Sequence, residues 1–137
     1  MAKTRLQINA WFEVMAELRP HLSRRAFASR VQRQQKRCGY KVAFLRVNGE
    51  VASVAGFRIT ECLAWGKFLY VDDLVTNSSL RSKGYGAKLL RWLVQFAKTH
   101  GCDEFHLDSG IQRLAAHKFY KRHKLPISCY HFSRKLK

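Results

Sequence analysis

The chain has 137 residues, with 26 lysines and arginines against 9 aspartates and glutamates, so its formal net charge at pH 7 is +17. A chain of this length is one domain of ordinary size, which we expect to span residues 1–137. No apolar run reaches membrane-spanning length and the first residues carry no signal-peptide pattern, which predicts a soluble, cytoplasmic protein without a membrane partner. The net positive charge favours an anionic ligand and would also attract nucleic acid. The alternative is that the charges only form a solvated cationic surface.

The cysteines give no sign of a metal site. They lie far apart, form no Cys-x-x-Cys motif and are Cys38, Cys62, Cys102 and Cys129. No pair of histidines has zinc spacing, so no metal is predicted. Four cysteines formally permit disulfides, but we expect buried free thiols in a reducing compartment.

The N-terminal region predicts helices. Apolar residues at helical spacing over Ile8–Leu18 predict one amphipathic helix that Pro20 ends. Ser23 is a candidate N-cap for a second helix over about Arg24–Arg37, whose face is strongly basic. Only Thr4–Ile8 could form a strand before these helices, so a first strand is short or absent.

A hairpin follows the helices. Cys38-Gly39 ends the second helix, and Tyr40–Val47 alternates as a strand does. Asn48-Gly49 is a strong signal for a two-residue turn, and Val51–Ile59 returns as the partner strand. Gly56 within that strand predicts a bulge or a close approach of another group.

The sequence is organised around a strand, a turn with two glycines and a long helix. After the turn at Trp65-Gly66, the β-branched and aromatic run Phe68–Val75 suits a strand buried on both sides. The polar segment Thr76–Ser79 ends it, and from Gly86 apolar residues recur at helical spacing as far as the closing His100-Gly101.

The turn itself, Arg81-Ser82-Lys83-Gly84-Tyr85-Gly86, predicts a phosphate-binding site. It presents the free N–H groups and the positive dipole end of a helix, and glycines let a bulky anion reach the backbone. Arg81 and Lys83 add full positive charge. The segment is too short for a dinucleotide fingerprint and lacks the P-loop ending, and the alternative is an ordinary turn.

Arg81-x-x-Gly84-x-Gly86 between a strand and a helix resembles the acetyl-CoA pyrophosphate motif of the GNAT family of N-acetyltransferases. Downstream, Phe119-Tyr120-Lys121-Arg122 resembles the late helix of that family with its tyrosine, and the likeness covers roughly residues 40–136. It implies the acyl-CoA N-acyltransferase (GNAT) fold. That fold is α/β, with a mixed, mainly antiparallel central sheet, a splayed pair of parallel strands and flanking helices.

The rest of the chain fits that order. Asp103–Asp108 alternates and predicts the next parallel strand, reached through a right-handed crossover. Gln112–Lys124 predicts a helix that Pro126 ends, and Ile127–Leu136 predicts a final strand. The inward side chains of that helix are expected to be Leu114, Ala115, Phe119 and His123.

The resemblance implies acetyl-CoA as the cosubstrate. Backbone groups where two parallel strands diverge would bond the pantetheine arm or the thioester carbonyl, and the glycine turn would bind the pyrophosphate. The residues concerned are Leu74, Val75, Thr76, Arg81, Ser82, Lys83, Gly84, Tyr85, Gly86 and Ala87. Arg113 stands where many relatives carry an asparagine that contacts coenzyme A, so its role stays open.

Acetyl transfer to an amine also requires a neutral amine and a proton for the leaving thiolate. The resemblance places Tyr120 as the general acid; the alternative is a half-buried tyrosine with a satisfied hydroxyl. Asp72-Asp73-Leu74 resembles the Glu-Asp-Leu run of polyamine acetyltransferases, whose carboxylates hold or deprotonate a cationic substrate. Without a bulge only one of the two aspartates can face the amine, and the alternative is pairing with an arginine.

Three further side chains are candidates. Asp108 ends the predicted strand next to the central one, and His106 and His117 could act as bases. A lone helical histidine is more often structural.

The leading hypothesis is therefore an acetyl-CoA-dependent N-acetyltransferase in which the amine attacks the thioester directly in a ternary complex, since no cysteine has a recognisable nucleophile setting. The acceptor could be a small amine, a polyamine, an antibiotic amino group, or the N-terminus or a lysine of a protein, and the enzyme a monomer or homodimer. The alternative is a non-catalytic module of GNAT-like fold that binds coenzyme A, another anion or nucleic acid. No RNA- or DNA-binding motif accompanies the charge, which argues against a nucleic-acid partner.

Overall fold

The structure is a computed structural model that describes residues 2–137. Its elements are α1 (Arg5–Asn9), α2 (Phe12–Leu18), α3 (Arg24–Cys38), β1 (Lys41–Val47), β2 (Glu50–Cys62), β3 (Gly66–Thr76), η1 (Ser78–Leu80), α4 (Tyr85–Thr99), β4 (Glu104–Leu107) and α5 (Leu114–Arg122). Contacts within the chain define two compact units, a first that ends at His106 and a second over Leu107–Lys137.

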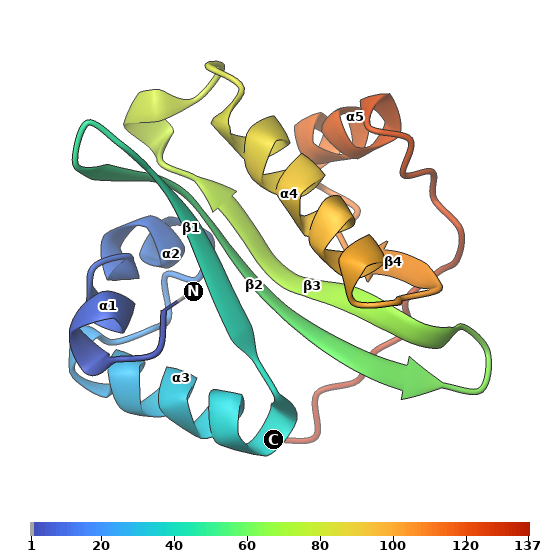
Figure 1. The fold of residues 1–137 in the computed structure, drawn as a ribbon, viewed down its shortest axis with the longest axis horizontal. Helices are drawn as coiled ribbons and strands as arrows, with labels where there is room; N and C mark the ends of the chain where they lie inside the picture. Colours follow the sequence, from blue (N-terminus) through green and yellow to red (C-terminus); the bar gives the residue numbers. More distant parts are fainter. Residues whose placement is uncertain (1) are drawn as a thin grey trace. The chain divides into compact units, whose positions relative to one another are not determined.

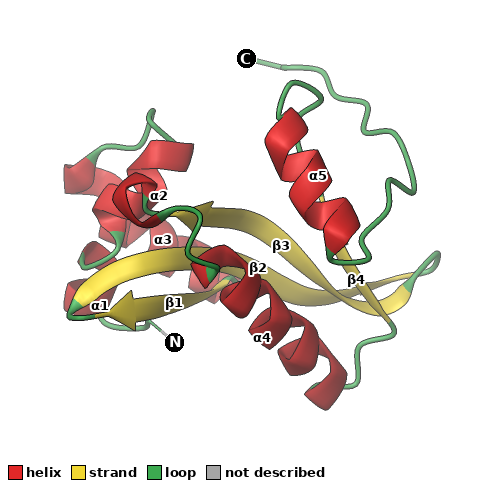
Figure 2. Cartoon of the chain, turned by 90° about the horizontal axis from the view of Figure 1, so that it is seen from above, coloured by secondary structure: helices red, strands yellow, loops and turns green. Residues whose placement is uncertain are grey.

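A four-stranded sheet runs through the first unit in the order β1-β2-β3-β4 (Figure 1). The pairs β1-β2 and β2-β3 are antiparallel, and the sheet as a whole is mixed. Helices α1 to α3 cover one face of the sheet and α4 covers the other (Figures 1 and 2). The predicted fold class, a mixed and mainly antiparallel sheet with flanking helices, is confirmed.

The N-terminal region differs from the sequence prediction. One helix over Ile8–Leu18 was expected, but α1 ends at Asn9 and α2 begins at Phe12, with Trp11 in a non-helical conformation between them. Ile8, Trp11 and Phe12 are all buried in the core, and their i, i+3, i+4 spacing would place them on one face of an unbroken helix as well. Thr4 caps α1 through a capping box, so the possible strand over Thr4–Ile8 is absent from the described residues.

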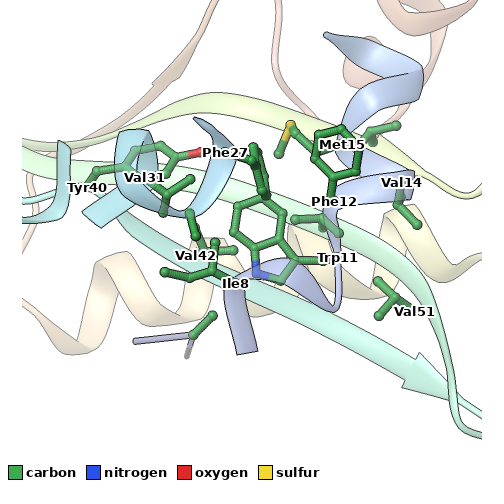
Figure 3. Close-up of a cluster of buried hydrophobic side chains, with 14 residues drawn as sticks. Ile8, Trp11, Phe12, Val14, Met15, Phe27, Val31, Tyr40, Val42 and Val51 are labelled. Atoms are coloured by element: carbon green, nitrogen blue, oxygen red, sulfur yellow. The ribbon is translucent and has the colours of Figure 1, made fainter. Parts of the chain in front are cut away.

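The core on this face of the sheet is built from aromatic and aliphatic side chains of the three helices and the strands (Figure 3). Phe27 of α3 packs edge-on against Trp11 and Phe12, with ring centroids 4.7 and 4.9 Å away. Trp11 is fully buried at 0% exposure, so this aromatic group fixes α3 against the two short helices.

The predicted ends of α3 and the turn of the hairpin are confirmed, while β2 continues to Cys62, beyond the predicted end at Ile59. The Ser23 hydroxyl accepts from the Ala26 amide at the start of α3, and Gly39 ends the helix in the left-handed region with φ 65°. Asn48 and Gly49 have φ values of 51° and 82° in the turn between β1 and β2. Positive φ at both central residues is what a type I′ hairpin turn requires.

The opposite face of the sheet carries α4. Its buried side chains are Leu89, Leu90, Leu93 and Ala97. Phe57 of β2 points to this helix and packs edge-on against Phe96, with ring centroids 5.4 Å apart. The apolar stripe expected from the helical spacing is therefore the one that covers the sheet.

The second unit departs from the prediction in two places. Leu114, expected to face inward, is 66% exposed, Ala115 is also exposed, and α5 has no buried residue. The predicted strand over Ile127–Leu136 does not form. A strand needs a neighbour that satisfies its backbone groups, and within Leu107–Lys137 only Leu107 belongs to a strand.

The four cysteines are free, as predicted, but the expectation that they are buried is wrong. Cys38 and Cys129 are exposed, and Cys62 and Cys102 are partly exposed.

Candidate functional site

A β-bulge in β3 brings the side chains of two adjacent aspartates, Asp72 and Asp73, to the same cavity. Asp73 pairs with Gly56 of β2, while Val71 pairs with the next residue, Phe57. Asp72 lies between them without a partner in the register, so it is the extra residue of the bulge. A regular strand would point the two aspartates to opposite faces, and the bulge removes that alternation. Both side chains line the same cavity.

Asp72 is held by an arginine of the neighbouring strand. Arg58 donates to both carboxylate oxygens, with distances of 2.9 Å from Nε and 2.7 Å from the terminal nitrogen. This bidentate contact is the main reason why the pKa of Arg58 is raised above its usual value. Both oxygens of Asp72 are therefore engaged by one guanidinium.

Asp73 is held by two different groups. Arg19, just after α2, donates from Nε to Oδ1 at 2.8 Å, and the Tyr40 hydroxyl donates to Oδ2 at 2.7 Å. Arg19 also donates to the backbone carbonyl of Asp72 at 3.0 Å. Burial, followed by the charge of Asp73, raises the pKa of the Tyr40 hydroxyl well above its usual value, so this phenol stays protonated.

The aspartates open into a cavity between α2, α3 and the sheet. Two adjoining compartments of about 230 and about 340 Å³ share Arg19, Gln34, Tyr40 and Asp73 in their walls. The larger one adds Cys38, Arg58 and Asp72. The smaller one adds Trp11, Met15, His21, Leu22, Phe27, Arg30 and Val31. The smaller compartment thus combines apolar side chains with Arg30 and His21 beside the helices, and the larger one adds charged groups of the sheet.

The turn before α4 leaves its N–H groups open. Gly84 is the N-cap of α4 with φ 80°, and no side chain within the described chain caps the first helical turn. A Cβ on Gly84 would meet no atom within 4 Å, so glycine is needed there for the backbone angle. Ser82 also has a positive φ of 64°, and successive N–H groups in such turns form anion-binding concavities.

Two contacts fix this turn to the rest of the first unit. The hydroxyl of the fully buried Ser53 donates to the Tyr85 carbonyl at 3.4 Å and holds α4 against β2. On the other side, Glu17 of α2 accepts from the Ser78 amide at 3.0 Å and lies 3.8 Å from the Arg81 guanidinium. Because Arg19 follows Glu17 by two residues, the end of α2 connects the turn to Asp73.

β3 extends beyond its neighbour β4. The Asp103 amide donates to the Lys67 carbonyl at 2.7 Å, so β4 begins beside the start of β3. β4 has four residues, whereas β3 continues as far as Thr76. The last residues of β3, from Leu74 to Thr76, therefore lie past the end of β4 and pair with β2 on their other side.

The other candidates lie elsewhere in the chain. In the second unit, Tyr120 lies on α5 and Arg113 at its N-cap; burial raises the pKa of the Tyr120 hydroxyl, and Arg113 acts in the opposite direction. His117 Nε2 lies 2.7 Å from the Gly110 carbonyl, which gives this histidine a structural contact. Asp108 pairs with His131 at 2.8 Å.

His106, in the first unit, has structural contacts as well. It stacks on Trp65 with ring centroids 3.7 Å apart and pairs with Glu104. No group of three or more His, Cys, Asp or Glu side chains in residues 2–137 is arranged to hold a metal ion. None of the helices described is both long and apolar enough to cross a bilayer.

The first unit combines a strand, a glycine turn without a side-chain cap and an amphipathic helix, beside a charged cavity. This combination makes the comparison with known proteins informative. The family model described as the Acetyltransferase (GNAT) family matches residues 6–124. This chain belongs to the GNAT acetyltransferase family. It is also 32% identical over 109 residues to YhdJ of Bacillus subtilis, an N-acetyltransferase that is itself uncharacterised, and the match covers 80% of this chain and 77% of YhdJ.

Solved structures show the same GNAT fold. A provisionally named acetyltransferase of Agrobacterium tumefaciens strain C58 superposes with a TM-score of 0.84 at 20% identity, covering 98% of this chain and 97% of that chain. An aminoglycoside N-acetyltransferase, AAC(6')-Iy, in complex with CoA gives 0.83 at 14% identity, covering 98% and 92%. At these identities the likeness is one of fold.

Three residues of this site were not predicted from the sequence. Arg19, Tyr40 and Arg58 hold the two aspartates, but nothing in their local sequence marks them as partners. One signal was available: Gly56 predicted a close approach, and the group that approaches it is the Tyr40 hydroxyl. The alternative of an aspartate paired with an arginine applies to both aspartates.

Proposed function

We propose that this GNAT protein transfers the acetyl group of acetyl-CoA to a primary amine, which attacks the thioester directly in a ternary complex. The observation that carries the proposal is the uncapped first turn of α4, which begins at the left-handed Gly84 and has Arg81 and Lys83 beside it. Free backbone N–H groups, a helix dipole and two cations suit a pyrophosphate.

Different segments of the chain are proposed to bind different parts of acetyl-CoA. The backbone over Ser82–Ala87, with Arg81 and Lys83, would hold the pyrophosphate, and Gly84 and Gly86 keep the approach free of side chains. The end of β3, at Leu74, Val75 and Thr76, would bond the pantetheine arm, as supported by its extension past β4. Arg113 is a further cation for phosphate or backbone carbonyls.

When bound, acetyl-CoA supplies an activated acyl group as a thioester. The amine nitrogen forms a bond to the carbonyl carbon and the carbon–sulfur bond breaks, so the sulfur requires a proton and the nitrogen must lose one. Tyr120 is the proposed donor to the sulfur. A tyrosine hydroxyl holds its proton throughout the neutral pH range, and burial, which raises the pKa of Tyr120, keeps that proton in place.

The two aspartates have different proposed roles. Each oxygen of either aspartate accepts one of these hydrogen bonds, but Asp73 lines both compartments of the cavity whereas Asp72 lines only the larger one. Asp73 is therefore the better candidate to take the amine proton, through a water molecule. Both carboxylate oxygens of Asp72 accept hydrogen bonds from Arg58, and we propose that this pair holds the lining of the acceptor site in place.

The proposal is tested in two steps with the whole chain. Calorimetry should detect binding of CoA and acetyl-CoA, and a screen of amines with acetyl-CoA should detect release of free thiol. Tyr120→Phe should lower kcat by about 10²-fold or more while CoA affinity is unchanged. Absence of CoA binding by folded protein would overturn the proposal.

The alternative functions give different results in the same assays. A non-catalytic module would bind CoA but release no thiol with any amine, and Tyr120→Phe would then have no activity to reduce. A nucleic-acid binder would bind an oligonucleotide with an affinity that falls steeply with salt. Binding of CoA or of an oligonucleotide without any release of thiol would contradict an enzymatic role.

A further inference from the structure

We infer that the acceptor of this enzyme is an amine that also carries an acidic group, such as a carboxylate or a phosphonate, and that Arg30 binds that acid. This inference rests on the proposed function, because it names the substrate class of the same site. It is carried by the charges that line the cavity and by their pairing.

The carboxylates of the cavity are already neutralised by arginines. Its walls contain three arginines (Arg19, Arg30 and Arg58) and two aspartates (Asp72 and Asp73). Asp72 is bound in bidentate fashion by Arg58, and Asp73 by Arg19 together with the Tyr40 hydroxyl. Because both carboxylates that line the cavity already have guanidinium partners, the second ammonium of a polyamine would compete with Arg19 or Arg58 for them.

One cation of the cavity remains without a carboxylate. Arg30 of α3 lines the smaller compartment, and among the residues described no carboxylate forms a salt bridge with it. His21 and Gln34, on the same wall, offer further nitrogen donors. Arg30, His21 and Gln34 are exposed residues beside the cavity, and a planar guanidinium with neighbouring donors is suited to a carboxylate or phosphonate.

The compartment joins this cation to the reaction end of the site. Arg30 and Asp73 line the same volume of about 230 Å³, which is large enough for a small molecule and too small for a folded segment. An acceptor whose acid binds Arg30 can therefore present its amine at Asp73. Apolar walls from Met15, Phe27 and Val31 would contact the carbon atoms between the two groups.

The inference is tested with four amines of similar size: 2-aminoethylphosphonate, β-alanine, propylamine and putrescine. Their binding to the CoA-saturated protein is measured by calorimetry, and thiol release is measured separately with acetyl-CoA. We expect the two acid-bearing amines to bind at least tenfold more tightly than propylamine and putrescine, and comparison of the first two distinguishes phosphonate from carboxylate.

Arg30→Gln identifies the residue responsible. It should raise the Kd and KM of the acid-bearing amines about tenfold and leave propylamine and the KM of acetyl-CoA unchanged. Arg33→Gln is the matched control, since Arg33 is an exposed arginine of the same helix outside the cavity lining. Arg30→Glu should shift the preference from the acid-bearing amines toward putrescine.

Each result bears on one claim. If propylamine or putrescine binds as tightly as the acid-bearing amines, or if Arg33→Gln weakens binding as much as Arg30→Gln, the inference is wrong while the acetyltransferase proposal stands. If the acid-bearing amines bind through Arg30 but no thiol is released, the acetyltransferase proposal is wrong and the anion site at Arg30 stands.

Discussion

The hydroxyl group of Tyr40 occupies the space in which a side chain on residue 56 would begin. A Cβ on Gly56 would overlap the oxygen and two ring carbons of Tyr40. Gly56 also pairs across the strands with Asp73, whose carboxylate accepts the Tyr40 hydroxyl proton in a 2.7 Å hydrogen bond. The absence of a side chain at Gly56 therefore permits the contact between Tyr40 and Asp73.

Gly56→Ala should destabilise the protein by about 1–3 kcal/mol, because Tyr40 or the strand must move to make room. The free energy of unfolding in urea measures this cost. The same substitution in a Tyr40→Ala background removes the clash, so its cost there should be much smaller. Equal costs in the two backgrounds would show that Tyr40 does not occupy this space.

Tyr40→Phe keeps the ring and removes the hydroxyl, so it should cost about 1.5–3 kcal/mol, the range for a hydrogen bond to a charged group. The pKa of the Tyr40 hydroxyl is raised in the folded state. The unfolded chain therefore ionises first, near pH 10, and the stability from this group is present below that pH and falls as the pH rises toward the folded pKa. The unfolding free energy of Tyr40→Phe should fall less steeply above pH 10 than that of the wild type.

The two aspartates should differ when each is replaced by its amide. Asp73→Asn should lower kcat by about 10²-fold if Asp73 accepts the amine proton, as measured by thiol release at saturating acceptor. Asp72→Asn should have a smaller effect on kcat and a larger one on acceptor KM, because both oxygens of Asp72 contact Arg58. Identical losses of kcat in the two variants would contradict separate roles.

Gly84→Asp and Gly84→Asn separate charge from backbone strain. Both residues tolerate the left-handed region comparably, so the φ of 80° affects the variants alike. The aspartate should weaken CoA binding about tenfold more than the asparagine, as measured by calorimetry, because it places a negative charge at the proposed pyrophosphate site.

Gly39 supplies the control for that pair. It is a left-handed glycine at the end of α3, with φ 65° and open space around it. Gly39→Asp and Gly39→Asn should bind CoA equally well. A CoA affinity that does not distinguish Gly84→Asp from Gly84→Asn would place the pyrophosphate elsewhere.

The local features of this protein could be predicted from its sequence because each depends on residues close together in the chain. Gly39, the Asn48-Gly49 turn and the amphipathic α4 rest on backbone preference and helical periodicity, and the structure confirms all three. The Arg81-x-x-Gly84-x-Gly86 motif pointed to the GNAT family for the same reason, since its spacing is local.

The arrangement of the cavity was decided only by the tertiary structure. Whether Asp72 and Asp73 face the same side depends on the register of β3 against β2, and Arg19 meets Asp73 across a separation of 54 residues. The predicted strand over Ile127–Leu136 failed for a related reason: its residues have β propensity, but a strand forms only where a neighbour pairs with its backbone. Local pattern sets what a segment can form, and the contacts between distant segments decide which of these possibilities is realised.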